Sequence, residues 1–356
     1  MFNKEIRIGT KKIGLRYPTY FIADIAANHD GDLNRAKELI YLAKESGADC
    51  AKFQHFLAEK IVSDYGYKHL KGIKSHQDNW DKSVAEIYDE YHCKREWNEE
   101  LIKTCKEVDI EFMTTPYDYE AIEQIDKYVN AYKIGSGDIT WTEFLERISK
   151  LNKPILLATG ASDMNDVIRA MDLISKNNSD VVLMQCNTNY TADLKNMKYV
   201  NLRVLNTFKQ YFPNVILGLS DHTFGHSAVL GAVTLGARVI EKHFTDDNNR
   251  VGPDHKFAMN PNTWKEMVLR TRELENALGD GIKRVEDNEQ DTIIIQRRSI
   301  RLTKDKKCGE KITLDDIEYL RPAPQNSYFP FEVDLVLNKT LNVDKVKGDC
   351  LVHGDI

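Results

Sequence analysis

The sequence predicts a (β/α)8 barrel followed by a small β-rich domain. Eight short apolar runs rich in β-forming residues alternate with segments of helical period over roughly 250 residues, the typical size of such a barrel. Several runs are apolar on both faces, as buried parallel strands are. Polar residues close the runs, and a barrel presents its chemistry at the carboxyl ends of its strands.

The predicted strands follow one another at even spacing along the first three quarters of the chain. They cover residues 20–26, 49–56, 110–117, 131–136, 154–159, 181–187, 215–222 and 239–244. Right-handed crossovers give the strand order in the sheet. The connection 57–97 is long and carries the segment Ser75-His76-Gln77-Asp78-Asn79-Trp80. A connection of this length at the catalytic end is typical of a lid or a substrate wall.

The last barrel helix and the tail define the expected domain boundaries. A capping box from Thr263 to Glu266 is expected to start the helix, and Gly279 to stop it. The charged stretch 280–290 lacks helical periodicity, which indicates a linker. We therefore expect a barrel at 1–282, a linker at 283–297 and a small domain at 298–356. A unit of ~60 residues is marginal alone, so it is expected to lean on another surface.

Composition excludes several classes of protein. The 356 residues are 42% hydrophobic with a net charge of −6, which supports a large core and argues against a nucleic-acid partner. The polar start at 1–16 lacks a signal-peptide core, and no run approaches the ~18 apolar residues of a membrane span. We expect a cytoplasmic protein without a membrane partner. Six scattered cysteines without a CxxC pair indicate reduced core thiols.

Two histidines close the last two predicted strands. Because side chains alternate along a strand, Ser220 points the same way as His222, and Glu241 the same way as His243. A single histidine at a strand end is usually structural, but two on neighbouring strands favour a divalent metal with open positions for Lewis-acid chemistry. His226, His255 and His353 are interpreted as structural or surface residues.

Two lysines lie within apolar runs. Lys52 and Lys133 would each be costly to bury without an anion, and with nearby hydroxyls they favour a small phosphorylated ligand. Each lysine alternatively forms a salt bridge, remains solvated, or acts as a Schiff-base nucleophile. The other strand-end candidates are Asp24, Asn28, His29, Gln54, Thr115, Ser136, Asp138, Thr159, Thr188, Tyr190, Ser220 and Glu241.

Six ordered segments resemble those of the bacterial sialic acid synthase family, which makes nonulosonic acids. They read ADIAANHDGD at 23–32, GADCAKFQ at 47–54, YKIGSG at 132–137, GLSDHT at 218–223, EKHFT at 241–245 and GPDH at 252–255. The tail, with Arg321-Pro322, resembles the antifreeze-like (SAF) domain of such enzymes.

This resemblance implies condensation of phosphoenolpyruvate with the open-chain aldehyde of an N-acetylated hexosamine, giving a nine-carbon 2-keto-3-deoxy acid and phosphate. It implies Mn²⁺, or alternatively Mg²⁺ or Co²⁺, on His222 and His243, and a homodimer in which the tail crosses to the partner's barrel and Arg321 contacts the sugar. Contacts to phosphoenolpyruvate fall on Lys52, Thr115, Lys133, Ser136 and Ser220, and those to the sugar on Asp138, Tyr190 and Asp254. The expected substrate contacts also include Gln54 and Thr188. The expected catalytic residues are Glu241, Asp24, Lys52 and Lys133.

The chain departs from the family pattern at several positions. Asp24 and Asp138 stand where glutamate is usual, Ala158 replaces a serine, and Thr188 an asparagine. The glycine-rich segment that usually follows this arginine in the family is replaced after Arg321 by Pro-Ala-Pro-Gln. Asp138 is one methylene shorter than the usual glutamate, and Asn189 lies beside Tyr190, which changes reach and polarity around the sugar. We therefore expect a diacetamido-trideoxyhexose of the legionaminic or pseudaminic type as acceptor, with N-acetylmannosamine as the alternative. Rival readings are a synthase of seven- or eight-carbon keto acids, a Schiff-base aldolase, and a non-enzymatic sugar-binding protein.

Overall fold

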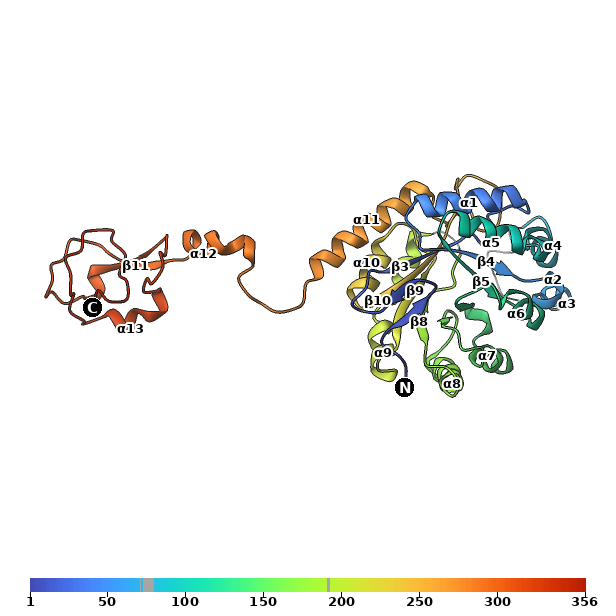
Figure 1. Cartoon of the computed structure of the whole chain (residues 1–356), viewed down its shortest axis with the longest axis horizontal. Helices are drawn as coiled ribbons and strands as arrows, with labels where there is room; N and C mark the ends of the chain where they lie inside the picture. Colours follow the sequence, from blue (N-terminus) through green and yellow to red (C-terminus); the bar gives the residue numbers. More distant parts are fainter. Residues whose placement is uncertain (71, 73–79, 191–192) are drawn as a thin grey trace. The chain divides into compact units, whose positions relative to one another are not determined.

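The computed structural model describes residues 1–70, 72, 80–190 and 193–356. The chain divides into two compact units, Met1–Gly279 and Asp280–Ile356 (Figure 1). The expected segment Ser75 to Asn79 lies outside the described residues. In the described part of the chain, no helix has the length and apolar character needed to cross a membrane.

The first unit is built around the eight predicted strands, which form one parallel sheet. They are β3 (Tyr20–Asp24), β4 (Cys50–His55), β5 (Glu111–Pro116), β6 (Tyr132–Ile134), β7 (Ile155–Ala158), β8 (Val181–Cys186), β9 (Ile216–Asp221) and β10 (Ala237–His243). The order is β5-β4-β3-β10-β9-β8-β7-β6, and β5 contacts β6, so the sheet curls into a barrel. The predicted fold class is confirmed.

Helices cover the outside of the barrel (Figure 1). They are α1 (Leu33–Glu45), α5 (Asn98–Glu107), α6 (Tyr119–Ile125), α7 (Thr142–Ser149), α8 (Met164–Ser175), α9 (Val204–Tyr211), α10 (Ser227–Thr234) and α11 (Pro261–Leu278). The long connection after β4 carries α2 (Ala58–Ile61), α3 (Asp64–His69) and α4 (Val84–Tyr91). Short 3-10 turns occupy Arg95–Trp97, Ser136–Asp138 and Leu194–Tyr199.

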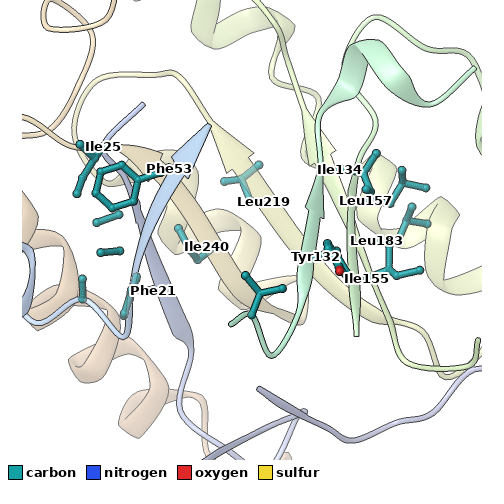
Figure 2. Close-up of a cluster of buried hydrophobic side chains, with 14 of the residues drawn as sticks. Phe21, Ile25, Phe53, Tyr132, Ile134, Ile155, Leu157, Leu183, Leu219 and Ile240 are labelled. Carbon is teal, nitrogen blue, oxygen red and sulfur yellow. The ribbon is translucent and has the colours of Figure 1, made fainter. Parts of the chain in front are cut away.

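Strand alternation separates two hydrophobic layers. Phe21 and Phe53 belong to the large cluster between barrel and helices, shown in Figure 2. Tyr20, Ile22 and Cys50 belong to a second cluster that fills the barrel interior. Residues two positions further along the same strands share the inward face. Asp24 and Lys52 therefore continue the interior layer at the carboxyl end of the barrel.

A hairpin of β1 (Ile6–Ile8) and β2 (Lys11–Ile13) precedes the barrel and was not predicted. Its isoleucines at 6, 8 and 13 are buried in the interior cluster, next to Tyr20 and Ile22 at the start of β3. The hairpin thus covers the amino-terminal end of the barrel. The only signal in this charged stretch is the alternation of the first two isoleucines.

The start of α11 differs from the prediction. Asn260 caps the helix by accepting hydrogen bonds from the backbone N–H groups of Asn262 and Thr263, and Pro261 takes the first helical position. Asparagine followed by proline is a strong signal for the start of a helix. The helix therefore begins one turn before the predicted capping box at Thr263, and that prediction was wrong. Gly279 ends the helix with a φ of +60°, as predicted.

The second unit has its own small core. Its antiparallel strands are β11 (Ser299–Leu302) and β12 (Ile317–Leu320), and its helices are α12 (Gln290–Gln296) and α13 (Val333–Val336), with 3-10 turns at Asp287–Glu289, Leu314–Asp316 and Pro330–Glu332. The expected linker therefore contains a helix. All six cysteines are free, as predicted, but Cys308 is exposed, so it is not a core thiol.

Candidate active site

Strand register gathers the predicted residues at the carboxyl end of the barrel. His243 on β10 lies opposite Asp24 on β3, and Asp24 lies opposite Lys52 on β4. On the other side of β10, Glu241 lies opposite Ser220 of β9. Neighbouring inward positions on four strands therefore place carboxylates beside cations and hydroxyls.

Lys52 forms a buried ion pair with Asp24. The Lys52 Nζ lies 2.6 Å from Asp24 Oδ2, and both side chains are only 2% exposed. Gln54 Nε2 donates to the same oxygen at 2.9 Å, and Lys52 donates to Thr115 Oγ1 at 3.4 Å. Burial alone would lower the pKa of Lys52, but Asp24 and Glu241 raise it above its ordinary value. The amine is therefore held protonated.

A second lysine lies beside a second carboxylate. Lys133 Nζ lies 3.4 Å from Glu241 Oε1 and donates to the carbonyl of Ile134 at 3.2 Å. Ser220 Oγ also donates to Glu241 Oε1, at 3.2 Å. The other carboxylate oxygen, Oε2, is buried without a hydrogen-bond partner among the described residues. This oxygen is available to accept a proton or a hydrogen bond from a ligand.

The two predicted histidines lie next to each other, with ring centroids 5.3 Å apart. His222 Nδ1 donates to the carbonyl of Asn187 at 2.9 Å and lies 4.0 Å from Cys186 Sγ. Burial lowers the pKa of His222, but Cys186 and the Asn187 carbonyl raise it above its ordinary value. Burial lowers the pKa of His243 well below its ordinary value, so this ring is neutral. Its buried Nδ1 has no hydrogen-bond partner among the described residues.

These features fit a bound cation. Neutral imidazoles with free lone pairs are the form that binds metal, and carboxylates lie close by. Asp254 Oδ2 is 3.6 Å from His243 Nδ1, and Asp24 Oδ2 is 3.8 Å from His243 Nε2. Within the described ranges, no three His, Cys, Asp or Glu side chains are already arranged around one point as metal ligands. The two imidazole rings would supply two protein ligands to a cation.

Aromatic rings flank the histidine pair. The ring of Tyr190 lies 4.3 Å from that of His222, and Phe257 lies 4.9 Å from His243, between centroids. Phe257 was not predicted, because it lies in the loop after β10 with no periodic pattern around it. The loop is fixed by His255, which is fully buried between Thr245 Oγ1 at 2.7 Å and Asp30 Oδ1 at 2.8 Å. The structural interpretation of His255 is thus confirmed.

A cavity of about 400 Å³ opens above these groups. It is lined by Ala27, Gln54, Phe56, Ile61, Trp80, Ile87, Tyr88, Tyr91, Tyr117, Gly137, Asp138, Tyr190, His243, Pro253 and Asp254. Burial raises the pKa values of Asp138 and Asp254 to about 6 each. Five lining residues come from the long connection 57–97, as expected for a substrate wall. Lys52 and Lys133 lie beneath this lining, at 1% and 3% exposure.

The remaining predicted residues lie around the site in different roles. Ser136 Oγ accepts from the backbone N–H of Gly160 at 2.9 Å. A Cβ on Gly160 would come within 2.4 Å of the Thr188 methyl group, so glycine permits this close approach. Ala158 is buried and provides no hydroxyl. Arg321 belongs to the second unit and is exposed.

Other polar residues of the strand ends are structural. Asn28 Nδ2 donates to the carbonyl of Phe244 at 2.9 Å, and Thr159 Oγ1 to that of Met184 at 2.9 Å. His29 is fully buried, accepts from the N–H of Gly31 at 3.1 Å, and burial lowers its pKa to about 4. These groups hold the barrel rim and lie outside the cavity lining.

Comparison with known proteins agrees with this geometry. Residues 39–283 match the model of the NeuB family. The chain is 37% identical to the N,N'-diacetyllegionaminic acid synthase of Campylobacter jejuni, over 88% of this chain and 93% of that protein. It is 35% identical to the enzyme of the same name from Legionella pneumophila, over 98% of both chains.

A solved structure gives the same result. The N-acetylneuraminic acid synthetase of Leptospira borgpetersenii, determined with citrate, superposes with a TM-score of 0.71 at 26% identity, covering 82% of this chain and 95% of that one. The likeness therefore extends from sequence to fold across most of both molecules. The chain belongs to the NeuB family, that of the sialic acid or nonulosonic acid synthases.

Proposed function

We propose that this barrel joins phosphoenolpyruvate to the open-chain aldehyde of an N-acetylated hexosamine. In this reaction C3 of the enol attacks the aldehyde carbon, and the aldehyde oxygen takes up a proton to become a hydroxyl. Water adds at C2, the phosphate leaves with the oxygen that joined it to C2, and the oxygen supplied by water remains as the ketone. One water is consumed, and the products are a nine-carbon 2-keto-3-deoxy acid and phosphate.

The observation that carries this proposal is the pair of buried lysines at the catalytic end of the barrel. Lys52 and Lys133 lie within the inward layer, each beside a carboxylate, and such cations suit the phosphate and carboxylate of phosphoenolpyruvate. The Glu241 oxygen without a partner supports a role in accepting the proton of the attacking water.

A divalent cation held by His222 and His243 would polarise the aldehyde carbonyl and stabilise the negative charge that develops on its oxygen. The two rings would supply nitrogen donors, and the Asn187 carbonyl fixes the orientation of the first. Tyr190 and Phe257 pack against both rings and would limit the access of water to them.

The charge of Lys52 argues against a Schiff-base aldolase. A Schiff-base nucleophile must be a neutral amine, whereas Asp24 and Glu241 overcome the effect of burial and raise the pKa of Lys52. Borohydride trapping with pyruvate is accordingly expected to leave Lys52 unmodified.

We further propose a 2,4-diacetamido-2,4,6-trideoxyhexose as the acceptor. Two relatives that match nearly the full barrel are named for a diacetylated product. Asp138 lines the cavity, and its Oδ2 has no hydrogen-bond partner among the described residues. A carboxylate in this position suits the N–H of a second acetamido group. N-acetylmannosamine is the alternative acceptor.

The second unit is proposed to act across a homodimer. It is a small compact domain that carries an exposed arginine, Arg321. The tail resembles antifreeze-like domains, and we propose on that ground that Arg321 contacts the sugar in the partner's barrel. The site would then be completed by two chains.

The proposed reaction is tested by measuring phosphate release from phosphoenolpyruvate with and without each aldehyde, and by mass spectrometry of the product. We expect release only with acceptor and metal present, and loss of release in Lys133→Met. Phosphate release that does not require an aldehyde, or a product with seven or eight carbons, would contradict the proposal.

A further inference from the structure

We infer that an apolar wall in the cavity selects acceptor sugars that carry methyl groups over fully hydroxylated ones. The apolar wall consists of Phe56, Ile61, Ile87, Tyr88 and Tyr117, and all five line the cavity. The inference rests on the proposed function, because it names the feature by which the same site chooses its acceptor.

Three aromatic rings make the apolar wall continuous. The ring of Phe56 lies 5.1 Å from that of Tyr88 and 5.9 Å from that of Tyr117, between centroids. Rings at such separations pack favourably against each other. Phe56 is only 7% exposed, so its position is set by packing on both sides. The three rings come from separate segments and still form one surface.

The segment that carries Ile87 and Tyr88 is stabilised within its helix and tied to the barrel after it. Helix α4, which holds Ile87 and Tyr88, begins at a capping box in which Ser83 and Glu86 each bond the other's backbone. Beyond the helix, Arg95 forms ion pairs with Asp118 and Glu120, directly after Tyr117. The apolar wall is therefore held in position before a sugar binds, as discrimination between two substrates requires.

The chemistry of the apolar wall favours methyl groups. Phe56, Ile61 and Ile87 offer no hydrogen-bonding atom, so a sugar hydroxyl pressed against them loses its bonds to water without replacement. A methyl group in the same place gains by leaving water. Burial raises the pKa of Tyr88 to about 12, so this ring adds no charge at neutral pH.

The polar side of the same cavity suits the hydrogen-bonding groups of the sugar. Gln54, Asp138 and Asp254 come from the strand ends and the loop after β10, and they supply amide and carboxylate groups. A diacetamido-trideoxyhexose has N–H groups for this side and C6 and acetyl methyl groups for the apolar wall. N-acetylmannosamine instead carries hydroxyls at C4 and C6, so in the same orientation it would present a hydroxyl to the wall where the diacetamido sugar presents a methyl group.

The test compares Ile87→Ser with Asp89→Ser. Ile87 is half-buried on α4, so the polar substitution leaves the core untouched, whereas Asp89 is exposed on the same helix and does not line the cavity. We would measure kcat/KM for 2,4-diacetamido-2,4,6-trideoxymannose and for N-acetylmannosamine, and calorimetric Kd values for their reduced, non-reacting alditols.

The wild type and Asp89→Ser are expected to share one preference for the diacetamido sugar, and Ile87→Ser to reduce that preference about tenfold, or 1.4 kcal/mol. An Ile87→Ser enzyme whose preference is unchanged, with both acceptors weakened equally, would overturn the inference. If no acceptor gives turnover, the proposed function fails. The Kd values of the two alditols then still test the apolar wall. The inference is overturned if the wild type binds both alditols equally, or if Ile87→Ser does not change the ratio of their Kd values.

Discussion

The ion pair between Lys52 and Asp24 gives the most direct test of how the site is held together. Both side chains are 2% exposed, and the charges lie 2.6 Å apart. Removing one partner of such a pair leaves a buried charge and costs ~3–5 kcal/mol, whereas removing both costs much less. Asp24→Asn removes the negative charge beside the Lys52 ammonium, and the Thr115 hydroxyl at 3.4 Å is a neutral partner that does not replace it, so we expect the upper part of this range.

Lys52→Met is expected to cost less than Asp24→Asn. The Asp24 carboxylate keeps its hydrogen bonds from Gln54 Nε2 at 2.9 Å and from the N–H of Ala26 at 3.1 Å. We expect ~2–3 kcal/mol for this variant and a coupling of at least ~2 kcal/mol in the double variant. All three variants should release no phosphate, since the cation or its orienting carboxylate is lost.

Urea unfolding followed by tryptophan fluorescence measures these changes in the barrel alone, because all four tryptophans of the chain lie before residue 280. The matched control is the pair of Lys242 and Asp221, equally buried at 2.5 Å but on the outward face of the neighbouring strands. Lys242→Met should destabilise the barrel similarly and retain turnover. Single changes at Lys52 and Asp24 that each cost under ~1 kcal/mol, with no coupling, would refute the reasoning.

Three further predictions follow from the site. Chelation should abolish phosphate release and Mn²⁺ restore it, while His222→Ala and His243→Ala stay folded but inactive; full activity after thorough chelation would exclude the metal. Burial raises the pKa of Asp138 to about 6, so the folded state binds more protons than the unfolded state below that pH, and its stability falls as pH rises from about 4 to 6. Asp138→Asn should therefore stabilise the barrel by ~1–2 kcal/mol at pH 7.5, after allowance for partial exposure, and by little at pH 4. The same variant should raise the KM for the acceptor. Equal changes in stability at both pH values would contradict this reasoning. Mixing Arg321→Ala with His222→Ala chains should recover part of the activity if the site is shared between subunits, and proven exchange without recovery would place Arg321 in its own chain's site.

The fold was predictable because its signals are local and repeated. Each strand is a short apolar run, and the alternation of side chains fixes which residues face inward. The same alternation predicted that His222 and His243 would share a face with Ser220 and Glu241, and their rings do lie 5.3 Å apart. Strand ends on neighbouring strands converge in any barrel, so spacing along the chain was sufficient.

Residues placed by loops were not predictable in the same way. Phe257 reaches the histidine pair only because His255 fixes the loop against Asp30, a contact between residues 225 positions apart. The apolar wall joins Phe56, Tyr88 and Tyr117 from three segments with no shared period. The hairpin at the start escaped notice because charged residues surround its isoleucines.

Unsatisfied polar atoms give an independent reason to place the chemistry at this end of the barrel. A buried donor or acceptor without a partner costs ~1–3 kcal/mol, so folded proteins retain few of them. Buried side-chain atoms of this kind occur in several parts of the described chain, and Glu241 Oε2, His243 Nδ1 and Asp138 Oδ2 are three of them, from the carboxyl ends of strands or the turns after them. Packing alone would have favoured partners for these atoms. These three atoms lie in or beside the proposed substrate site, so a bound ligand would supply their hydrogen bonds or coordination, and stability is given up where binding requires it.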